Sequence, residues 1–555
     1  MSDVRIAGDD LVFLPLGGSG EIGMNLNLYG HAGKWLMVDL GMSFTDGQVP
    51  GVDLVFPDPK FIVERRDDLL GLILTHGHED HIGAVPHLWP MLRCPIWATA
   101  FTAELVKNKL AERGLLEDAE IHIAKPEVEI ELRPFRVRYV PLAHSIAEGN
   151  GLTIETPAGT VFHTGDWKLD RDPIIGSPST PEELTAIGDK GVLAMVGDST
   201  NVFTAAESGS ETAVKEALVE QVKAVKQRAL ITTFASNVAR VDTIGEVAKA
   251  TGRHLVAVGR SLGRVIAAAK ATGYLQNLPK LVDEEDAGHL PRDKVLLMTT
   301  GCQGEPRAAL SRIASGEHKH IGLTAGDTVI FSSKIIPGNE LVIGALVNTL
   351  VIKGVHVITE KDAFVHVSGH PGRQELAEMY RWIRPEIAVP VHGEARHIKR
   401  HAEFAEELGV RRSFRPQNGD VIRLTPEPAA HLGSVAHGRL LLDGDRLARA
   451  DAEAILERRR MMFNGALSIT LEVDLDGLPI AEPIITAFGI AGFGEGGDVE
   501  AEVVDAIETA VETTVRRGRR DEASIEDAVR IAARRVCRQV LGKRPVTKVE
   551  LIVVE

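Results

Sequence analysis

The sequence predicts an α/β protein of several domains, and three observations lead to this prediction. The chain has 555 residues, more than a single hydrophobic core usually organises. Segments typical of strands and of helices alternate up to about residue 200 and again over residues 211–300, which is the pattern of sheets covered by helices. At residue 466 a shorter series of strands and helices begins, and it predicts a small α+β domain.

The first elements follow from local patterns. Residues 11–16 are an apolar run that predicts a strand, and the glycine-rich residues 17–25 predict a tight loop. This loop lacks the Lys-Ser/Thr pair of a P-loop, so it does not indicate a nucleotide site. Residues 25–29 and 35–39 are expected to form a hairpin.

A second domain is predicted to interrupt the first. The runs 229–233, 254–258 and 295–300 predict strands and helical runs separate them, a pattern typical of a parallel sheet. Residues 420–424 and 438–445 are expected to return as strands of the first domain. The predicted parts are 1–213 and 366–450 for the first domain, 214–365 for the inserted domain, 451–465 for a helical linker and 466–555 for the C-terminal α+β domain.

The composition is that of a soluble globular protein, with 44% hydrophobic and 25% charged residues. No apolar run is long enough to span a membrane, and the N-terminus lacks the pattern of a signal peptide, so we expect a cytoplasmic protein. Cys94, Cys302 and Cys537 are widely spaced and indicate neither a zinc knuckle nor a disulfide framework. The net charge of −16 argues against a general nucleic-acid coat but allows an enzyme with a locally positive channel.

Potential metal ligands are concentrated directly after the apolar run 69–74, which predicts a buried strand and precedes a helix expected to begin at Ile82. Within six residues lie His76, His78, Asp80 and His81. So many imidazoles and carboxylates would repel and desolvate one another without a cation. Imidazole and carboxylate are ligands for zinc, and also for manganese or iron.

Three further candidate ligands also end predicted strands: His144, Asp166 and His392. Ends of strands at one edge of a sheet are a usual place for sites in layered α/β folds. Asp39, at the end of another predicted strand, has two interpretations. It either orients a ligand histidine from behind or is an ordinary turn carboxylate.

These seven positions match the HxHxDH signature and its remote partners in the metallo-β-lactamase superfamily, and the chain resembles that superfamily without a departure at any of them. The resemblance implies an αββα sandwich and two metal ions, zinc or another divalent metal such as manganese. The implied ligands are His76, His78 and His144 for one metal, Asp80, His81 and His392 for the other, and Asp166 for both.

The inserted domain makes the chain similar to the β-CASP members of the superfamily, which act on nucleic acids. Asp198 resembles the first acidic motif of that family, residues 366–370 resemble the second in its bacterial ribonuclease J form, and His392 resembles the third. Further similarity to ribonuclease J lies in residues 17–23, 232–237 and 332–340. The resemblance covers nearly the whole chain. It implies an RNase with 5′→3′ exonuclease and endonuclease activity in mRNA decay and in the maturation of rRNA and other RNAs.

The expected catalytic residues are Asp80, as a metal ligand, and His370, as the general acid for the leaving 3′ oxygen, held by Asp198. The alternative is that His366 and His370 are structural hydrogen-bonding residues. Phe234 is expected either to stack on a base or to belong to the core. The expected RNA and phosphate contacts are Phe234, Ser236, Asn237, His366, Val367, Ser368, Gly369 and His370.

Other expectations come from the family. Some ribonucleases J carry a structural calcium, for which Asp53 and Asp443 are the implied carboxylates; each is otherwise a turn aspartate. The family uses the C-terminal domain in oligomerisation, so we expect a homodimer or homotetramer, a place in an RNA-degradation complex and no membrane contact. Preferred substrates are expected to be single-stranded RNAs with a 5′-monophosphate.

Three alternatives remain at the level of the sequence. A DNA-processing β-CASP nuclease would share every motif and would differ in not reading the 2′-hydroxyl. A hydrolase of small thioesters or lactams would not need the inserted domain. A non-enzymatic RNA-binding scaffold would not need a complete set of ligands.

Overall fold

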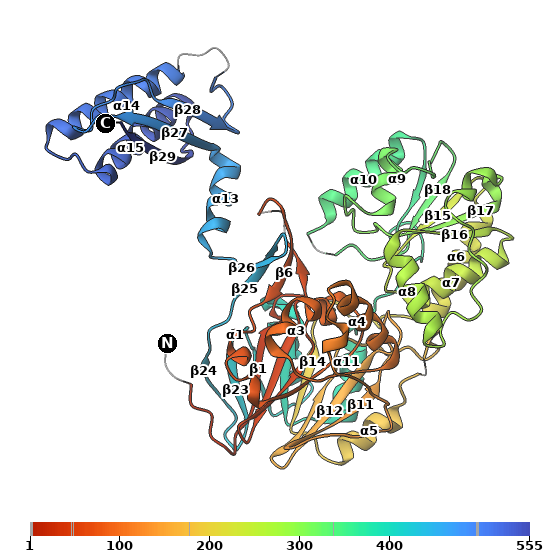
Figure 1. Cartoon of the computed structure of the whole chain (residues 1–555). Coiled ribbons are helices and arrows are strands. Elements are labelled where there is room, and N and C mark those ends of the chain that lie inside the picture. Colours follow the sequence, from red (N-terminus) through yellow and green to blue (C-terminus); the bar gives the residue numbers. More distant parts are fainter. Residues whose placement is uncertain are drawn as a thin grey trace. The chain divides into compact units, whose positions relative to one another are not determined.

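The computed structural model describes residues 4–45, 47, 49–176, 178–336, 338–494 and 499–554. The chain divides into two compact units (Figure 1). The first comprises Met1–Ser43 and Phe56–Gly438, and the second comprises Phe44–Val55 and Arg439–Glu555. The mixed α/β fold class with an inserted domain and a C-terminal α+β domain is confirmed.

The first unit contains two large sheets. The first sheet has the order β24 (Ala430–Ser434), β23 (Asp420–Thr425), β1 (Leu11–Gly17), β3 (Leu26–His31), β4 (Lys34–Val38), β7 (Leu69–Ile73), β8 (Ile96–Ala98) and β9 (Ile121–Ile123). The second has the order β10 (Ile130–Leu132), β11 (Phe135–Pro141), β12 (Asn150–Thr156), β13 (Gly159–His163), β14 (Ala194–Asp198), β20 (Ile387–Val391) and β22 (Arg412–Ser413).

The inner faces of these sheets share one hydrophobic core. Phe13 and Tyr29 of the first sheet are buried in the same cluster as Phe135 and Tyr139 of the second. The Tyr139 hydroxyl donates to the carbonyl oxygens of Leu74, at 3.1 Å, and Trp97, at 3.0 Å, so the two sheets are also joined by hydrogen bonds. A buried phenol needs such a partner, because an unpaired hydroxyl would lose its hydration without compensation.

Helices cover the outer faces, which completes an αββα sandwich. Apolar side chains of α5 (Pro181–Asp189), α11 (Arg373–Ile383) and α12 (Ala395–Glu407) pack with the second sheet. On the first sheet, α4 (Ala100–Glu112) contacts β8 and β9. The helix expected from Ile82 is divided: α2 spans Glu79–Ile82, and α3 begins after Gly83 and Ala84 and spans Val85–Leu92.

The inserted domain leaves the second sheet after β14 and returns at β20. These two strands are parallel neighbours, with Asp198 opposite Val391. The inserted sheet is parallel throughout, as predicted. Its order is β16 (His254–Val258), β17 (Val295–Thr299), β15 (Ala229–Thr232), β18 (Thr328–Phe331) and β19 (His356–Ile358).

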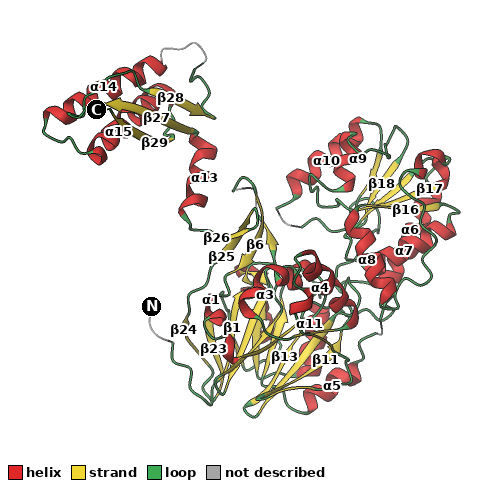
Figure 2. Cartoon of the chain, viewed as in Figure 1, coloured by secondary structure: helices red, strands yellow, loops and turns green. Residues whose placement is uncertain are grey.

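Helices lie on both faces of this parallel sheet (Figure 2). One core cluster joins it to α6 (Glu211–Ala224), α7 (Val238–Ala250) and α8 (Arg260–Ala271). Another joins it to α9 (Ala309–Ser315) and α10 (Glu340–Ile352).

The second unit begins with a small sheet of order β26 (Arg446–Arg449), β25 (Arg439–Asp443), β6 (Val52–Pro57) and β5 (Ser43–Phe44). The strand expected over residues 438–445 is therefore present as β25, but its sheet is not one of the two that carry the predicted ligands. The helix α13 (Glu453–Asn464) follows and lies within the predicted linker.

The C-terminal part of the second unit is an α+β domain with its own core. Its three strands are β28 (Ile484–Phe488), β27 (Ala466–Val473) and β29 (Val546–Val553), and its helices are α14 (Val499–Arg516) and α15 (Glu522–Leu541). Every second residue of β27 from Leu467 to Val473 is buried against the two helices. Among the described helices of the whole chain, none combines the length and the apolar composition that crossing a membrane requires.

Candidate metal centre

The centre lies where several strands of the two sheets end. β7 ends at Ile73 and α2 begins at Glu79. The short loop between them carries His76 and His78, and the first turn of α2 carries Asp80 and His81. β13 ends three residues before Asp166, and β20 ends directly before His392. The backbone of His392 has φ of 51°, in the left-handed region that non-glycine residues rarely adopt.

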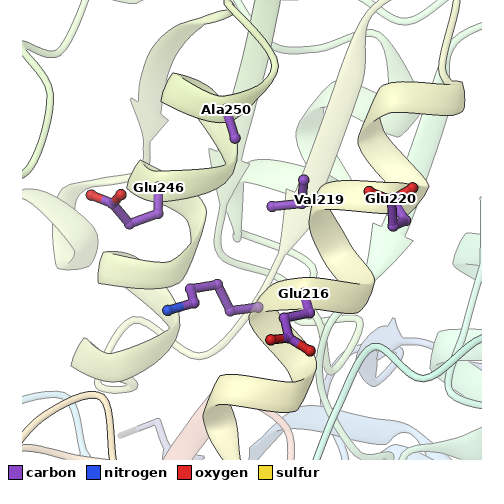
Figure 3. Close-up of a pocket in the computed structure, with 6 residues that line it drawn as sticks. Glu216, Val219, Glu220, Glu246 and Ala250 are labelled. Carbon is purple, nitrogen blue, oxygen red and sulfur yellow. The ribbon is translucent and has the colours of Figure 1, made fainter.

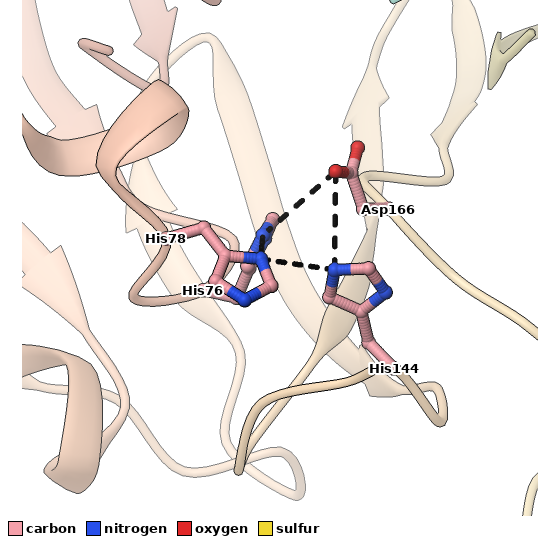
Figure 4. A group of neighbouring side chains, drawn as sticks. All are labelled: His76, His78, His144 and Asp166. Atoms are coloured by element: carbon pink, nitrogen blue, oxygen red, sulfur yellow. Dashed lines mark hydrogen bonds and ion pairs between the residues drawn. The ribbon is translucent and has the colours of Figure 1, made fainter. Parts of the chain in front are cut away.

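Three imidazoles converge in a first group with one carboxylate (Figure 4). His78 Nδ1 lies 3.1 Å from His76 Nε2 and 3.0 Å from His144 Nε2. Asp166 Oδ2 lies 4.0 Å from His76 Nε2 and 3.9 Å from His144 Nε2. The structure thus brings together the four residues expected around one metal.

A second group shares Asp166 with the first. Its Oδ2 lies 3.2 Å from His81 Nε2 and 3.3 Å from His392 Nε2. Asp80 Oδ2 lies 3.6 Å from each of the same two nitrogens. The Asp166 carboxylate is therefore placed between the two groups, where a bridging ligand is expected.

Neighbouring groups select which nitrogen of each ring faces the centre. His144 Nδ1 donates to the Gly369 carbonyl at 2.6 Å, so its Nε2 carries the free lone pair. Asp39 Oδ2 lies 2.7 Å from His81 Nδ1 and also accepts from the Thr75 hydroxyl at 2.9 Å. Of the two interpretations of Asp39, the structure supports the one in which this carboxylate orients a histidine.

Asn25 is a residue that the sequence interpretation did not assign to the site. Its Oδ1 lies 3.1 Å from His392 Nδ1, and its Nδ2 donates to the Asp80 carbonyl at 3.0 Å. Its side chain thus ties the loop after β20 to the loop after β7. The glycine-rich segment that ends at this asparagine was the available signal, but it could equally have been a plain turn.

The chemistry of the first group fits a cation. Burial, with the neighbouring imidazoles His81 and His78, lowers the pKa of His76 well below its usual value. Burial and His144 likewise lower the pKa of His78, and burial lowers the pKa of His144 to about 3. Neutral rings leave three lone pairs directed at one another, and a divalent ion satisfies such a set with these ligand types.

The second group fits a cation by a different route. Burial opposes charge on His81, but Asp166, Asp80 and Asp39 outweigh it and raise the pKa of His81 well above its usual value. A bound divalent ion would replace the proton that these carboxylates otherwise favour, because metal binding releases protons from its ligands.

His370 lies beside both groups, paired with an acidic residue. Its Nδ1 lies 2.7 Å from Asp198 Oδ2 and 3.9 Å from Asp166 Oδ2. Burial opposes its charge, but Asp198 outweighs burial and raises the pKa of His370 to about 9. Asp198 ends β14, where the chain leaves the sandwich for the inserted domain, and His370 lies in the segment that returns from it. The pair therefore forms where the outgoing and the returning chain lie side by side.

The segment 366–370 is held by an asparagine that the sequence interpretation also did not assign. Asn201 Nδ2 donates to Ser368 Oγ at 2.8 Å and to the His370 carbonyl at 3.2 Å. Lys334 Nζ, from the inserted domain, donates to Asn201 Oδ1 at 3.0 Å. A cation of the inserted domain thus contacts the asparagine that holds the segment 366–370. Val367 is buried, Gly369 contacts His144 through its carbonyl, and His366 Nδ1 is buried without a hydrogen-bond partner.

The other predicted RNA contacts lie in the turn between β15 and α7. Phe234 and Ser236 are half-buried, whereas Asn237 is buried. Asn237 Oδ1 caps α7 by accepting from the backbone N–H of Arg240 at 2.8 Å. This oxygen has a structural task, so the amide NH₂ is the part of Asn237 that remains to be used as a phosphate donor.

The two residues expected at a calcium site lie on neighbouring strands, Asp53 on β6 and Asp443 on β25. Both carboxylate oxygens of Asp443 accept from Arg458, at 2.8 Å each. A calcium ion bound by Asp443 would have to displace this guanidinium.

A surface pocket of about 350 Å³ on the inserted domain has a different chemistry (Figure 3). It lies between α6 and α7, and none of its lining residues belongs to the metal groups. Glu216, Glu220 and Glu246 line it, together with a single cation, Lys215. Three carboxylates disfavour a phosphate ligand, so this pocket does not compete with the metal centre as a site for nucleic acid.

The fold and this centre define a metal-dependent hydrolase of the metallo-β-lactamase superfamily with a β-CASP domain. Four family models match the chain. They are the metallo-beta-lactamase superfamily over residues 24–215, the ribonuclease J beta-CASP domain over 226–350, the Zn-dependent metallo-hydrolase RNA specificity domain over 354–414, and the ribonuclease J C-terminal domain over 453–554.

Comparison with curated relatives identifies the family. The chain is 43% identical to ribonuclease J of Sinorhizobium meliloti over 98% of its length and 97% of that protein. It is 33% identical to ribonuclease J 1 of Streptococcus pyogenes, with 98% of each chain covered. The chain therefore belongs to the ribonuclease J family, a family of metal-dependent nucleases.

The fold is also similar to that of a solved structure. A protein of unknown function from Enterococcus faecalis is superposed with a TM-score of 0.51 and 15% identity, covering 75% of this chain and 100% of that one. At this identity the likeness concerns the fold alone.

Proposed function

We propose that this protein hydrolyses single-stranded RNA in the cytoplasm, both from the 5′ end in the 5′→3′ direction and internally, in mRNA decay and in rRNA maturation. The observation that carries this proposal is the convergence of the two metal groups with the Asp198–His370 pair at the point where the inserted domain joins the sandwich. An extended polymer threaded between the sandwich and the inserted domain would meet all of these groups at once.

The two groups are proposed to hold zinc, with manganese as the other metal that the ligands suit. His76, His78 and His144 would hold one ion, and Asp80, His81 and His392 the other, with Asp166 shared. Two such ions, when bound, supply positive charge for the scissile phosphate and lower the pKa of the attacking water.

His370 is proposed to donate the proton that the leaving 3′ oxygen needs. Its Nδ1 is held by Asp198, so Nε2 is the nitrogen that faces the substrate. Replacing His370 with Ala should lower the rate by roughly 10²–10⁴-fold. The loss should be much smaller on an RNA with sulfur at the 3′ bridging position, because a thiolate leaves without protonation. An equal loss on both substrates would show that His370 only positions the RNA.

We further propose that the terminal 5′-phosphate binds between the Ser236–Asn237 turn and the segment 366–370. The donors are the Ser236 hydroxyl, the Asn237 NH₂ and the Ser368 loop. A monophosphate fits such a pocket, whereas a triphosphate brings extra charge that a closed pocket does not solvate.

The test compares one RNA with a 5′-monophosphate and the same RNA with a 5′-triphosphate. We expect fast trimming of the first, slow trimming of the second and similar internal cleavage of both. Ser236→Ala with Asn237→Ala should reduce the preference while internal cuts persist. Equal trimming of both wild-type substrates would overturn the pocket, and cleavage of matched DNA at the same rate would favour a DNA-processing nuclease instead.

Several finer features belong to the same proposal. The domain boundaries are proposed at 213/214, 365/366, 450/451 and 465/466, and the ribonuclease J beta-CASP match over 226–350 lies within the second of these parts. The protein is proposed to act as a homodimer or homotetramer within an RNA-degradation complex. A structural calcium between Asp53 and Asp443 is proposed to replace Arg458 at Asp443, and a rise of the thermal midpoint with added calcium, absent in Asp443→Asn, would support it.

A further inference from the structure

Phe203 is an exposed aromatic residue at the edge of the metal centre. It lies five residues after Asp198, in the turn that follows β14, and 52% of its surface is accessible to solvent. The neighbouring residues Thr204, Ala205, Ala206 and Glu207 are also exposed, so Phe203 is not part of a continuous apolar stretch of this turn. Exposing a ring of this size forgoes the burial that usually stabilises a phenylalanine.

The covered part of the Phe203 ring is packed against two nitrogen-bearing side chains. The His397 ring lies 5.2 Å from it between centroids, at an interplanar angle of 63°. The Arg396 guanidinium carbon lies over the ring, 5.9 Å from its centroid. Arg396 is itself fixed by Glu394, to which its Nε donates at 2.7 Å. These contacts leave the other part of the ring open.

This cluster is attached directly to the metal centre. The Thr200 hydroxyl, three residues before Phe203, donates to the carbonyl of the candidate ligand His392 at 3.1 Å. His397 packs over Gly393, the next residue after that ligand, where an added Cβ would lie 2.9 Å from His397 Cβ. The Lys334 ammonium donates to Asn201, two residues before Phe203. The ring is therefore held by residues that contact the candidate ligand His392 and its neighbour Gly393.

We propose that Phe203, backed by His397 and Arg396, stacks on one nucleobase of the RNA near the cleaved bond. This inference rests on the proposed function, because it adds a subsite to the same active site. Base–aromatic stacking tolerates every base, since each has a π-face, and an adjacent guanidinium strengthens it. The stack would anchor one nucleotide while the metal groups and His370 act on a phosphate close by.

The chemistry around the ring favours a nucleic acid over a protein partner. A protein hot spot usually lies within a desolvated apolar patch, whereas the groups packed against Phe203 are Arg396 and His397. Cations beside an aromatic ring are the combination that binds single-stranded RNA. A protein partner is thus an outcome that the test below can reveal.

The test is a scan of abasic nucleotides along a cleavable RNA oligonucleotide, with kcat and KM measured at each position. For the wild type we expect kcat/KM to fall by about 5- to 20-fold when the abasic site occupies the position opposite Phe203. In Phe203→Leu, which keeps an apolar side chain but removes the ring, the intact RNA should be slower by a similar factor. The abasic site at that one position should then have little additional effect.

Two variants serve as controls. Phe203→Trp keeps a stacking ring and should retain the fall in kcat/KM when the abasic site lies opposite residue 203. Phe364→Leu changes another phenylalanine with the same 52% exposure. This variant should show the same fall in kcat/KM as the wild type when the abasic site lies opposite Phe203. Thermal midpoints of all variants should match that of the wild type, because the altered rings are exposed.

The outcomes distinguish a failure of the proposed RNA hydrolysis from a failure of the stacking subsite. If the wild type fails to hydrolyse RNA, the proposed function itself is wrong. If it hydrolyses RNA but Phe203→Leu keeps the full wild-type abasic profile, the stacking subsite is refuted. A Phe203→Leu variant that cleaves RNA normally but no longer forms a complex with another protein would assign the ring to a protein contact instead.

Discussion

At the scale of single residues, the centre depends on which nitrogen of each histidine is free. Asp39, Asn25 and the Gly369 carbonyl each occupy one Nδ1 atom, on His81, His392 and His144 respectively. Each leaves the Nε2 of its ring directed inward. Without these partners the rings could rotate or adopt the other tautomer, and the lone pairs would no longer converge.

Asp39 therefore gives the first prediction. In Asp39→Ala, His81 loses the acceptor at 2.7 Å that fixes its ring, and the affinity for one of two metal ions should fall by about 10- to 100-fold. Competition with a chelator, followed by metal analysis, measures this. Asp67→Ala, which changes a carboxylate that is 99% exposed, is the control and should keep both affinities. An unchanged affinity for both ions in Asp39→Ala would contradict the prediction.

A second buried histidine gives a prediction about stability. His401 lies between the Ser199 hydroxyl and the Tyr380 hydroxyl, at 2.9 Å from each. Burial lowers the pKa of His401 from 6.5 to about 4. Above pH 6.5 neither the folded nor the unfolded state is protonated there. As the pH falls from 6.5 toward 4 the unfolded state takes up the proton first, so the folded state loses stability by up to about 1.4 kcal/mol per pH unit.

The variant His401→Gln removes this titration. Its thermal midpoint should be lower than that of the wild type at pH 7, and the difference between the two proteins should shrink as the pH is lowered to 5. Other buried histidines act equally in both proteins and cancel in the difference. Parallel midpoint curves across this range would show that His401 does not titrate as the structure indicates.

At the scale of elements, two chain crossings join the sandwich to the inserted domain, and one buried arginine holds both. Arg240 of α7 is fully buried and pairs with Glu211, the first residue of α6, at 2.8 Å. It also donates to the Ser332 carbonyl at 3.0 Å, the Ser332 hydroxyl and the Val365 carbonyl at 3.1 Å. Val365 directly precedes the segment that carries His370. The start of α6 and the returning chain are thus fixed to one guanidinium.

Replacing Arg240 should lower the free energy of unfolding of the inserted domain. Arg240→Leu leaves the Glu211 carboxylate buried without its cation, and we expect a loss of about 3–5 kcal/mol in the stability of the inserted domain. Lys249→Ala removes an exposed ion pair from the same helix and should cost less than about 1 kcal/mol. Thermal unfolding of both variants provides the comparison. Similar midpoints for the two variants would show that the buried pair contributes no more than a surface pair.

At the scale of the whole molecule, the C-terminal domain has a hydrophobic core of its own. Among the residues that the structure describes, those of this core cluster all lie from Leu467 onward. Removal of residues 466–555 should therefore leave the sandwich, the inserted domain and metal binding intact. If this domain assembles the proposed homodimer or homotetramer, the shortened chain should have fewer subunits per particle. Sedimentation equilibrium measures this, and an unchanged number of subunits would place the interface elsewhere.

The sequence by itself determined the chemistry and the class of fold. His76, His78, Asp80 and His81 lie within one loop, so their ligand character is visible in local spacing, and strand and helix periods are equally local. This is why the α/β class, the inserted domain and the family were predictable. The helix expected from Ile82 is one local expectation that failed, because Gly83 and Ala84 separate two short helices there.

Only the tertiary structure decided how distant residues meet. Asn25 contacts His392 across 367 positions of sequence, and Asn201 reaches Ser368 across 167. The Asp198–His370 pair forms because β14 and β20 are neighbours while a whole domain lies between them in the chain. Such contacts depend on strand order and on the packing of two domains, which no local period encodes. The same reason explains why the environment of Phe203 could not be foreseen: its partners belong to α12, and only folding brings that helix to the turn after β14.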